Sequence, residues 1–444
     1  MTISRTICLG FLSAIAIGTG LLMLPFAITE GHWGNFLIAL FTATSAVCVT
    51  GLSVVDPNTY FSFWGELSIA LLAQVGGLGY MTLTTFLMLL IGRKFDLQQR
   101  FAIQESFDRP FVQGSKNLIQ SVIATTLLFE ISGTIVLFLV FIQDYPPLEA
   151  LWYAIFHSVS AFNNAGFSLF PDNLIQYQSS IPVNLTITIL IIFGGIGYQV
   201  ILELYFWLKW IFKHPHRGFC FSLNFKVVMR VTGFLLLLGL IGILALESQA
   251  PKSLLELSAQ NRLMVAWFQS VTTRTAGFNT IDLNHFNATT LVLIMLLMFI
   301  GASPSGTGGG IKTTTFAILA NCTRSALRGQ ERVIMYERRI PPQLILKAIA
   351  VVFGSVMTVV ISLGLLIFLE AGKGTVELAF EAVSAFATVG LSLGITSQLT
   401  PLSQLVLIFT MFIGRVGVTI LMAAIVGDPR PSLIRYPEEN LLVG

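Results

Sequence analysis

The sequence predicts an all-α integral membrane protein, with four parallel helix–pore-loop–helix repeats and eight transmembrane spans around a pseudo-fourfold pore. The chain of 444 residues is 55% hydrophobic and only 11% charged, far from the balance of a soluble domain. A short pattern that begins with an aromatic residue and ends ten positions later at glycine, followed by Leu or Phe, occurs four times. Its glycines, Gly51, Gly166, Gly277 and Gly390, stand 115, 111 and 113 residues apart. A fixed period of this length indicates one unit built four times.

Each repeat is predicted to contain a span, a short helix that dips into the membrane, and a returning span. The predicted segments are 6–28, 39–50 and 67–91; 118–142, 151–165 and 183–211; 227–246, 263–276 and a span from 291 that breaks near 301; and 344–369, 376–389 and 402–425. Spans of about 20 residues match the hydrocarbon thickness. The dipping segments are too short to cross, and irregular backbone at this depth is tolerated only where it is buried or lines a cavity.

These segments divide the chain into repeats at 1–92, 93–212, 213–322 and 323–428, with an intramembrane loop at 301–315 and a C-terminal tail at 429–444. Of the 25 Lys and Arg residues, 19 fall in the loops and ends on one side of this topology. Positive charge gathers on the cytoplasmic side of membrane proteins, so both termini are predicted to be cytoplasmic. The four cysteines show no paired spacing, so neither a disulfide framework nor a zinc site is indicated.

The last three residues of each loop pattern are candidate ligands of a potassium ion. They are Val49, Thr50 and Gly51; Asn164, Ala165 and Gly166; Thr275, Ala276 and Gly277; and Thr388, Val389 and Gly390. Backbone carbonyls can replace the hydration shell of this ion, and glycine reaches the positive φ angles that such a loop needs. A calcium site would use carboxylates, and none stands at these positions. The alternative, that each glycine only ends a short helix, is disfavoured by four copies in register.

A second signature begins 24 to 28 residues beyond each loop glycine, at Gly76, Gly194, Gly301 and Gly414. Small residues there indicate close helix packing or a bend. In the third repeat this signature becomes the segment 301–315, whose five glycines and one proline exclude regular helix.

The segment 301–315 is similar to a phosphate-binding loop, but Ile311 stands where that motif needs glycine before Lys312. Nucleotide binding by this segment is therefore disfavoured. A static cytoplasmic turn is one reading, and a mobile intramembrane gate is the reading implied by the family resemblance given below. The candidate gate residues are Gly306, Gly308, Gly309, Gly310, Lys312 and Arg415.

Two arginines lie in or beside apolar segments. Arg415 interrupts the last span, and a buried arginine almost always faces a bundle interior or a water-filled cavity. We expect it to face the pore, with a purely structural ion pair as the alternative. Arg274 precedes Gly277 by three residues, and we expect it to pair with a carboxylate behind the loop.

The motifs Val-Thr-Gly-Leu, Asn-Ala-Gly-Phe, Thr-Ala-Gly-Phe and Thr-Val-Gly-Leu resemble those of the Trk/Ktr/HKT superfamily of potassium transporters, over essentially the whole chain. Eight spans resemble its bacterial KtrB type of membrane subunit. The resemblance implies channel-like potassium uptake across the cell membrane, with no cofactor in this chain. It also implies a homodimer, a cytoplasmic KtrA-like ring that binds the nucleotide, and stimulation or symport of sodium. By the same resemblance, the glycine-rich loop obstructs permeation, Arg415 interacts with it, and the tail reaches the dimer interface.

Three alternatives remain. Plant relatives with a sodium-selective pore carry serine at the first loop glycine, where this chain has Gly51. An ion-coupled secondary transporter would be built from inverted repeats with ionisable residues at mid-membrane, for which Glu130 and Glu203 are the main candidates. An integral membrane enzyme would need a catalytic constellation, and the sequence contains no recognisable one.

Overall fold

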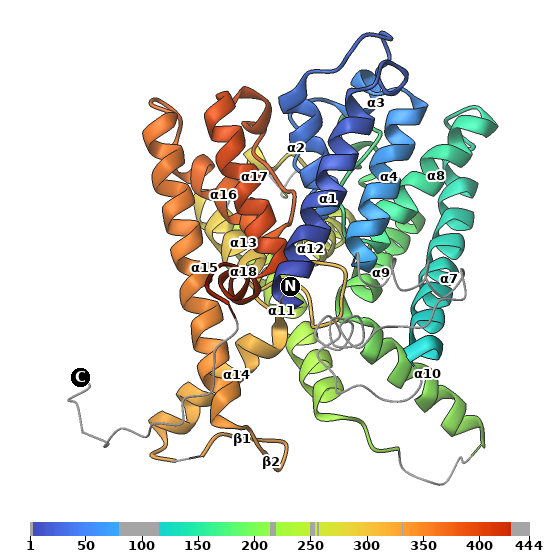
Figure 1. The fold of residues 1–444 in the computed structure, drawn as a ribbon. Coiled ribbons are helices and arrows are strands. Elements are labelled where there is room, and N and C mark those ends of the chain that lie inside the picture. Colours follow the sequence, from blue (N-terminus) through green and yellow to red (C-terminus); the bar gives the residue numbers. More distant parts are fainter. Residues whose placement is uncertain are drawn as a thin grey trace.

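The structure is a computed structural model that describes residues 3–79, 115–213, 219–248, 254, 257–330 and 332–427. It is a bundle of helices around a common axis (Figure 1). The strands β1 (Ile334–Met335) and β2 (Arg338–Arg339) and the end of α10 (Tyr198–Lys213) lie at one end of the molecule, and α3 (Pro57–Tyr60) lies at the other. The predicted end of the first returning span, beyond position 79, and the tail 429–444 lie outside the described residues.

The helices follow the predicted order of the repeats. Repeat one contains α1 (Ile3–Met23), α2 (Phe36–Val47), α3 (Pro57–Tyr60) and α4 (Phe63–Leu78). Repeat two contains α7 (Ser115–Phe141), α8 (Pro147–Phe162), α9 (Ile181–Ile196) and α10 (Tyr198–Lys213). Repeat three contains α11 (Leu223–Glu247), α12 (Ala259–Thr272), α13 (Ala288–Phe299) and α14 (Thr313–Leu327). Repeat four contains α15 (Pro342–Leu369), α16 (Thr375–Ala387), α17 (Pro401–Val416) and α18 (Val418–Val426).

Short elements complete the described fold. Single turns of 3-10 helix occur at Pro25–Ala27, Ile175–Tyr177, Leu283–His285 and Thr396–Gln398. The strands β1 (Ile334–Met335) and β2 (Arg338–Arg339) pair antiparallel, with Ile334 opposite Arg339. The two residues between them, Tyr336 and Glu337, both have positive φ, the geometry of a tight hairpin turn.

The repeats close into a ring through one recurring contact. The returning helix of each repeat packs against the short pore helix of the next, as α4 on α8, α9 on α12, α13 on α16 and α17 on α2. The aromatic residues that begin the pattern anchor these pore helices, since Phe41, Phe156 and Phe380 are fully buried. The four parallel repeats are therefore arranged around a pseudo-fourfold axis, as predicted.

The returning spans predicted at 183–211 and 402–425 each consist of two helices that meet at the glycine signature. Four described helices, α1, α7, α11 and α15, are long and apolar enough to cross a membrane, or six spans if each bent pair counts as one. The α9–α10 pair is bent by 103° and the α17–α18 pair by 95°, while α4 and α13 are short. Each returning helix thus stops at or near its glycine signature.

The signature glycines explain both the packing and the bend. A Cβ built on Gly76, the first glycine of its signature, would lie 2.1 Å from the Val47 carbonyl oxygen. At the equivalent Gly194 and Gly414, a Cβ would lie 1.9 Å and 1.8 Å from the nearest carbonyl oxygen. The last glycine carries the break. Gly79, Gly197 and Gly417 have φ values of 77°, 89° and 90°, which L-residues rarely adopt. The first glycine permits close approach to the pore helix, and the last ends the helix.

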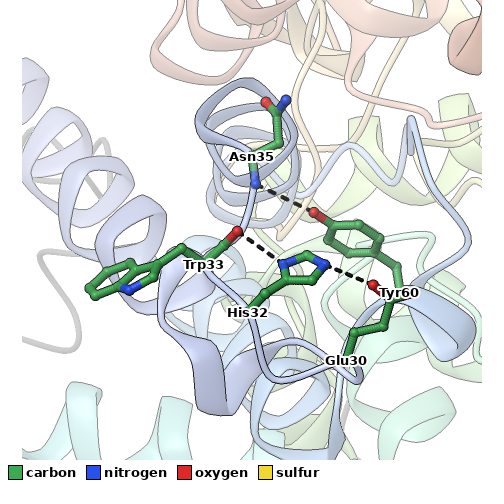
Figure 2. Close-up of polar contacts among 5 residues, drawn as sticks. All are labelled: Glu30, His32, Trp33, Asn35 and Tyr60. Carbon is green, nitrogen blue, oxygen red and sulfur yellow. Dashed lines mark hydrogen bonds and ion pairs between the residues drawn. The ribbon is translucent and has the colours of Figure 1, made fainter.

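The connection between α1 and α2 is tied by polar contacts (Figure 2). The Asn35 N–H donates to the Tyr60 hydroxyl at 3.5 Å, and the His32 ring contacts the Trp33 carbonyl and the Glu30 carboxylate. The hydrogen bond to the Trp33 carbonyl is the main cause of a raised pKa of His32, and the hydrogen bond to Glu30 adds to it. Both oxygens stabilise the protonated ring. The Asn35 side chain also accepts from Leu37 N–H at 2.8 Å, which caps the start of α2.

Candidate functional site: a ring of four loops

The four loop glycines form a closed ring of backbone contacts. A Cβ built on Gly51 would lie 2.6 Å from the carbonyl oxygen of Ala165 in the next repeat. The corresponding distances are 2.8 Å from Gly166 to Ala276, 2.4 Å from Gly277 to Val389 and 2.0 Å from Gly390 to Thr50. Real Cβ atoms do not approach so closely. Each glycine therefore admits the backbone of the following repeat, and the fourth repeat returns to the first.

The backbone of each loop alternates in the same way. The residues two before the glycines, Val49, Asn164, Thr275 and Thr388, have φ values of 51°, 55°, 70° and 51°. The glycines themselves have values of 88°, 73°, 78° and 90°, and the residue between each pair is not left-handed. Positive φ at β-branched residues costs energy and persists only where the surroundings enforce it. Three of the four loops carry such a residue, so the conformation is imposed by the site.

The N–H groups of the loops point back to the pore helices. Gly51 N–H donates to Ser45 Oγ at 3.0 Å and Gly390 N–H to Ser384 Oγ at 3.1 Å. In repeats two and three a pore-helix hydroxyl instead donates to a carbonyl just beyond the glycine, from Ser160 to Phe167 and from Thr272 to Phe278. These bonds tie every loop to its own helix.

The carbonyls of the loops are left available. Among the residues that the structure describes, none of the twelve predicted ligand residues has a carbonyl that accepts a hydrogen bond from the protein. The pore helices α2, α8, α12 and α16 all end at these loops, and the C-terminal end of a helix carries partial negative charge. A cavity of about 280 Å³ adjoins the ring and is lined by residues of all four repeats, among them Gly51, Asn173, Gly277 and Gly390. The arrangement suits a dehydrated monovalent cation.

The glycine-rich loop lies against the ring. Ser303 N–H donates to the Gly195 carbonyl at 2.9 Å, and Thr307 N–H donates to the Gly194 carbonyl at 3.1 Å. Gly309 N–H donates to Thr388 Oγ1 at 3.0 Å. A Cβ on Gly308 would lie 1.8 Å from Thr275 Oγ1, so only glycine fits there. This segment is packed between the repeats against two of the candidate ligand residues, Thr275 and Thr388.

Three cationic side chains hold this loop through its carbonyls. Arg415 donates to the carbonyls of Thr307 and Gly76, which joins the loop to repeat one. Lys312 Nζ donates to the Gly308 carbonyl at 2.8 Å. Within the described ranges, neither these two residues nor Arg274 forms an ion pair with a carboxylate. Their charge therefore stays uncompensated by carboxylates near the loop.

The expected carboxylate partner of Arg274 is not what the structure shows. Its Nη1 and Nη2 donate to the carbonyls of Ile300 and Gly301, each at 2.7 Å. The helix α13 ends at Phe299, and the guanidinium fork binds the carbonyls of the two residues that follow it. Arg274 thus fixes the start of the glycine-rich loop.

The two glutamates singled out in the spans have structural partners. Glu130 on α7 accepts from Asn163 Nδ2 at 3.0 Å, and the same amide donates to Gln74 at 2.6 Å, so three helices are joined. Glu203 accepts from the backbone N–H and the hydroxyl of Ser222, at 3.0 Å and 2.6 Å. It therefore braces the residue that caps α11.

His157 and Glu381, which were not among the predicted site residues, are fully buried on pore helices α8 and α16. Neither belongs to a metal-ligand or catalytic spacing. The signal that finds them is position, because each stands nine residues before its loop glycine.

Fold and site together define a multi-pass membrane protein with a pore-like ring made by four repeats of one chain. The family model described as "TrkH: Cation transport protein" matches residues 11–436. The chain therefore belongs to the TrkH family of cation transport proteins, and it is a transporter and not an enzyme, as predicted.

Named relatives match over nearly the full length. The Ktr system potassium uptake protein B of Bacillus subtilis is 36% identical, with 99% of this chain and 96% of the relative covered. The protein of the same name from Vibrio alginolyticus is 35% identical, covering 99% and 94%. The potassium/sodium uptake protein NtpJ of Enterococcus hirae is 34% identical, covering 99% and 97%. The crystal structure of the potassium transporter TrkH from Vibrio parahaemolyticus shares the fold, with a TM-score of 0.69, 19% identity and coverage of 95% of this chain and 85% of that one.

Proposed function

We propose that the protein takes up potassium across the cell membrane through the ring of four loops, which acts as a selectivity filter. The observation that carries this proposal is the set of twelve loop carbonyls that accept no hydrogen bond within the described structure. Oxygens held at the ring by backbone geometry can replace the water shell of the ion. The names of two full-length relatives, both called potassium uptake proteins, support the choice of ion.

The glycine-rich loop is the proposed gate, and Arg415 and Lys312 are its electrostatic part. The contact of Gly308 and Gly309 with Thr275 and Thr388 supports this assignment, since a segment in that place blocks the path of an ion leaving the ring. Movement of the loop would need the Arg415 bonds to the Thr307 and Gly76 carbonyls to break. Opening therefore involves both the loop and repeat one.

The protein is further proposed to act as a homodimer with a KtrA-like nucleotide-binding ring, with both termini in the cytoplasm. The word "system" in the names of the relatives supports a second component. The distribution of 19 of the 25 basic residues supports the orientation. The basic hairpin β1–β2 and the end of α10 lie at the same end of the molecule (Figure 1), which on this orientation is the cytoplasmic end where a ring would dock.

A mixed potassium and sodium pathway is the second candidate. The relative from Enterococcus hirae, 34% identical over 99% of this chain, is named a potassium/sodium uptake protein. We therefore propose sodium, as a stimulating or a transported ion, in addition to potassium as the transported ion. All four ring positions, Gly51 included, are glycine. This favours potassium, because glycine readily adopts the positive φ that the carbonyl ring needs.

The test is uptake of a rubidium tracer into liposomes that contain the purified protein, with a potassium gradient as the driving force. We expect uptake that external potassium inhibits at a much lower concentration than sodium. Equal inhibition by the two ions would favour the mixed pathway. No uptake above protein-free liposomes, by protein that elutes as a folded species and with a KtrA-like partner supplied, would contradict the proposed function.

Arg415→Gln is expected to raise rubidium uptake and to make it less dependent on a partner subunit. A unit charge about 4 Å from an ion contributes roughly 4 kcal/mol at an effective dielectric of 20, and water in the pore reduces this. A residual effect of about 1.4 kcal/mol changes an equilibrium tenfold. Arg415→Lys is the matched control, because it keeps the charge and loses the paired bonds to Thr307 and Gly76. A well-folded glutamine variant with slower uptake would show that Arg415 stabilises the fold and imposes no barrier.

A further inference from the structure

Two positions recur around each loop glycine and have not yet been given a role. Nine residues before the glycine stand Thr42, His157, Phe268 and Glu381, in repeat order. Two residues after it stand Ser53, Ser168, Asn279 and Ser392. The first position lies in the pore helix and the second in the segment that leaves the ring. In repeats two and four, a buried ionisable side chain is matched with a serine.

In repeat two, His157 binds Ser168 in one defined tautomer. Its Nδ1 lies 2.7 Å from the Tyr153 carbonyl, which can only accept, so Nδ1 carries the proton. Its Nε2 then accepts from Ser168 Oγ at 3.0 Å. Ser168 Oγ in turn accepts from the Phe170 N–H at 3.0 Å, and the imidazole stacks on the Phe170 ring with centroids 4.5 Å apart. The pore helix and the segment beyond the ring are thus locked together.

In repeat four, Glu381 makes the same connection with a different side chain. Ser392 Oγ donates to its carboxylate, and Thr396 Oγ1 lies 3.1 Å from both carboxylate oxygens. Ser392 Oγ accepts from the Gly394 N–H at 2.9 Å. The serine and the backbone N–H two residues later therefore repeat the geometry of Ser168 and Phe170.

Repeats one and three lack this connection. Thr42 Oγ1 has no hydrogen-bond partner among the described residues, and Ser53 Oγ donates to the Val55 carbonyl of its own segment. Phe268 offers no polar atom, and Asn279 Nδ2 donates to the Ile281 carbonyl at 3.1 Å. Because the ring contacts run from repeat one to two, three and four and back, the two connected repeats face each other across the axis.

We propose that His157 and Glu381 are positioning residues that hold the filter from two opposite repeats through Ser168 and Ser392, and so contribute to selectivity between potassium and sodium. The inference rests on the proposed function. Neither side chain touches the ion. Each restrains the backbone two residues after a ring glycine, near the loop carbonyls, where a small shift changes the size of the ion's cage. In the absence of the restraint, the loop can relax around the smaller sodium ion.

The test compares three serine variants at equivalent positions, Ser53→Ala, Ser168→Ala and Ser392→Ala, in the liposome assay. The readout is the sodium concentration that halves rubidium uptake, divided by the potassium concentration that does so. We expect this ratio to fall about two- to tenfold for Ser168→Ala and Ser392→Ala, the effect of one hydrogen bond. For Ser53→Ala we expect less than a twofold change, since its hydroxyl does not reach the pore helix.

Conservative replacement separates positioning from general stability. Glu381→Gln can still accept from Ser392 and should keep most of the ratio, whereas Glu381→Leu should lose it at equal amounts of folded protein. If Ser53→Ala lowers the ratio as much as the other two serine variants, or if all variants keep it, the proposal is wrong although the proposed function stands. If the wild-type protein takes up no rubidium, the proposed function fails and this inference fails with it.

Discussion

Gly51→Ser is expected to lower the preference for potassium over sodium by about tenfold, a change of roughly 1.4 kcal/mol in relative ion binding. The glycine has φ +88°, and a Cβ there would lie 2.6 Å from the Ala165 carbonyl oxygen and 2.8 Å from the Gly166 Cα. Neither neighbour is a flexible side chain, so the backbone of repeat two must move. The displaced Ala165 carbonyl is itself a proposed ion ligand. The measurement is sodium inhibition of rubidium uptake.

Gly31→Ser is the matched control for this prediction. Gly31 has φ +70° with no atom within 4 Å of its ideal Cβ, so serine there carries conformational strain alone. We expect the control to change the ratio by less than twofold. Equal sodium inhibition in Gly51→Ser and the wild-type protein, at equal folded amounts, would argue that the four loops are not the filter.

Deletion of Gly306–Gly308 is expected to raise rubidium uptake and to weaken control by a partner. The deletion removes the Thr307 carbonyl that Arg415 binds and the backbone packed against Thr275. An obstruction worth about 1.4 kcal/mol would correspond to a tenfold increase in rate. The measurement is the initial rate of uptake with and without the partner.

Ser303→Ala controls for loosening of the loop without shortening it. It removes only the hydroxyl contact of 2.9 Å with Thr313, and we expect uptake within twofold of wild type. A shortened variant with wild-type rate and wild-type regulation would mean that the loop does not obstruct the path, whatever its place beneath the ring.

Much of the fold could be predicted because the repeat contains positions that only one or two residue types can occupy. A glycine at one position in four loops follows from the close approach of four backbones, which no other residue allows. The break of the third returning span near Gly301 follows equally from composition, since α13 ends at Phe299. The roles of the loops and of Arg415 in transport stay predictions.

The remainder depended on contacts between repeats that a linear sequence does not express. The sequence predicts a carboxylate partner for Arg274. In the structure its guanidinium instead donates hydrogen bonds to two carbonyls just beyond the end of α13. The sequence left close packing and a bend as two readings of the glycine signatures, and the structure shows bends of 103° and 95° at two of them. His157 becomes informative only when the repeats are aligned on their glycines, since its partner Ser168 lies eleven residues away along the chain.

The closure of the ring by α17 on α2 and α1 on α18 has a thermodynamic consequence. All four quadrants belong to one polypeptide, so the ring forms by intramolecular contacts whose effective concentration does not fall on dilution. A channel assembled from four separate subunits loses its pore when the subunits dissociate, and its stability depends on protomer concentration. Here a single chain contains the whole ring of four loops. A ring built from one chain also lets each quadrant carry its own side chains, so the ring can be altered one quarter at a time.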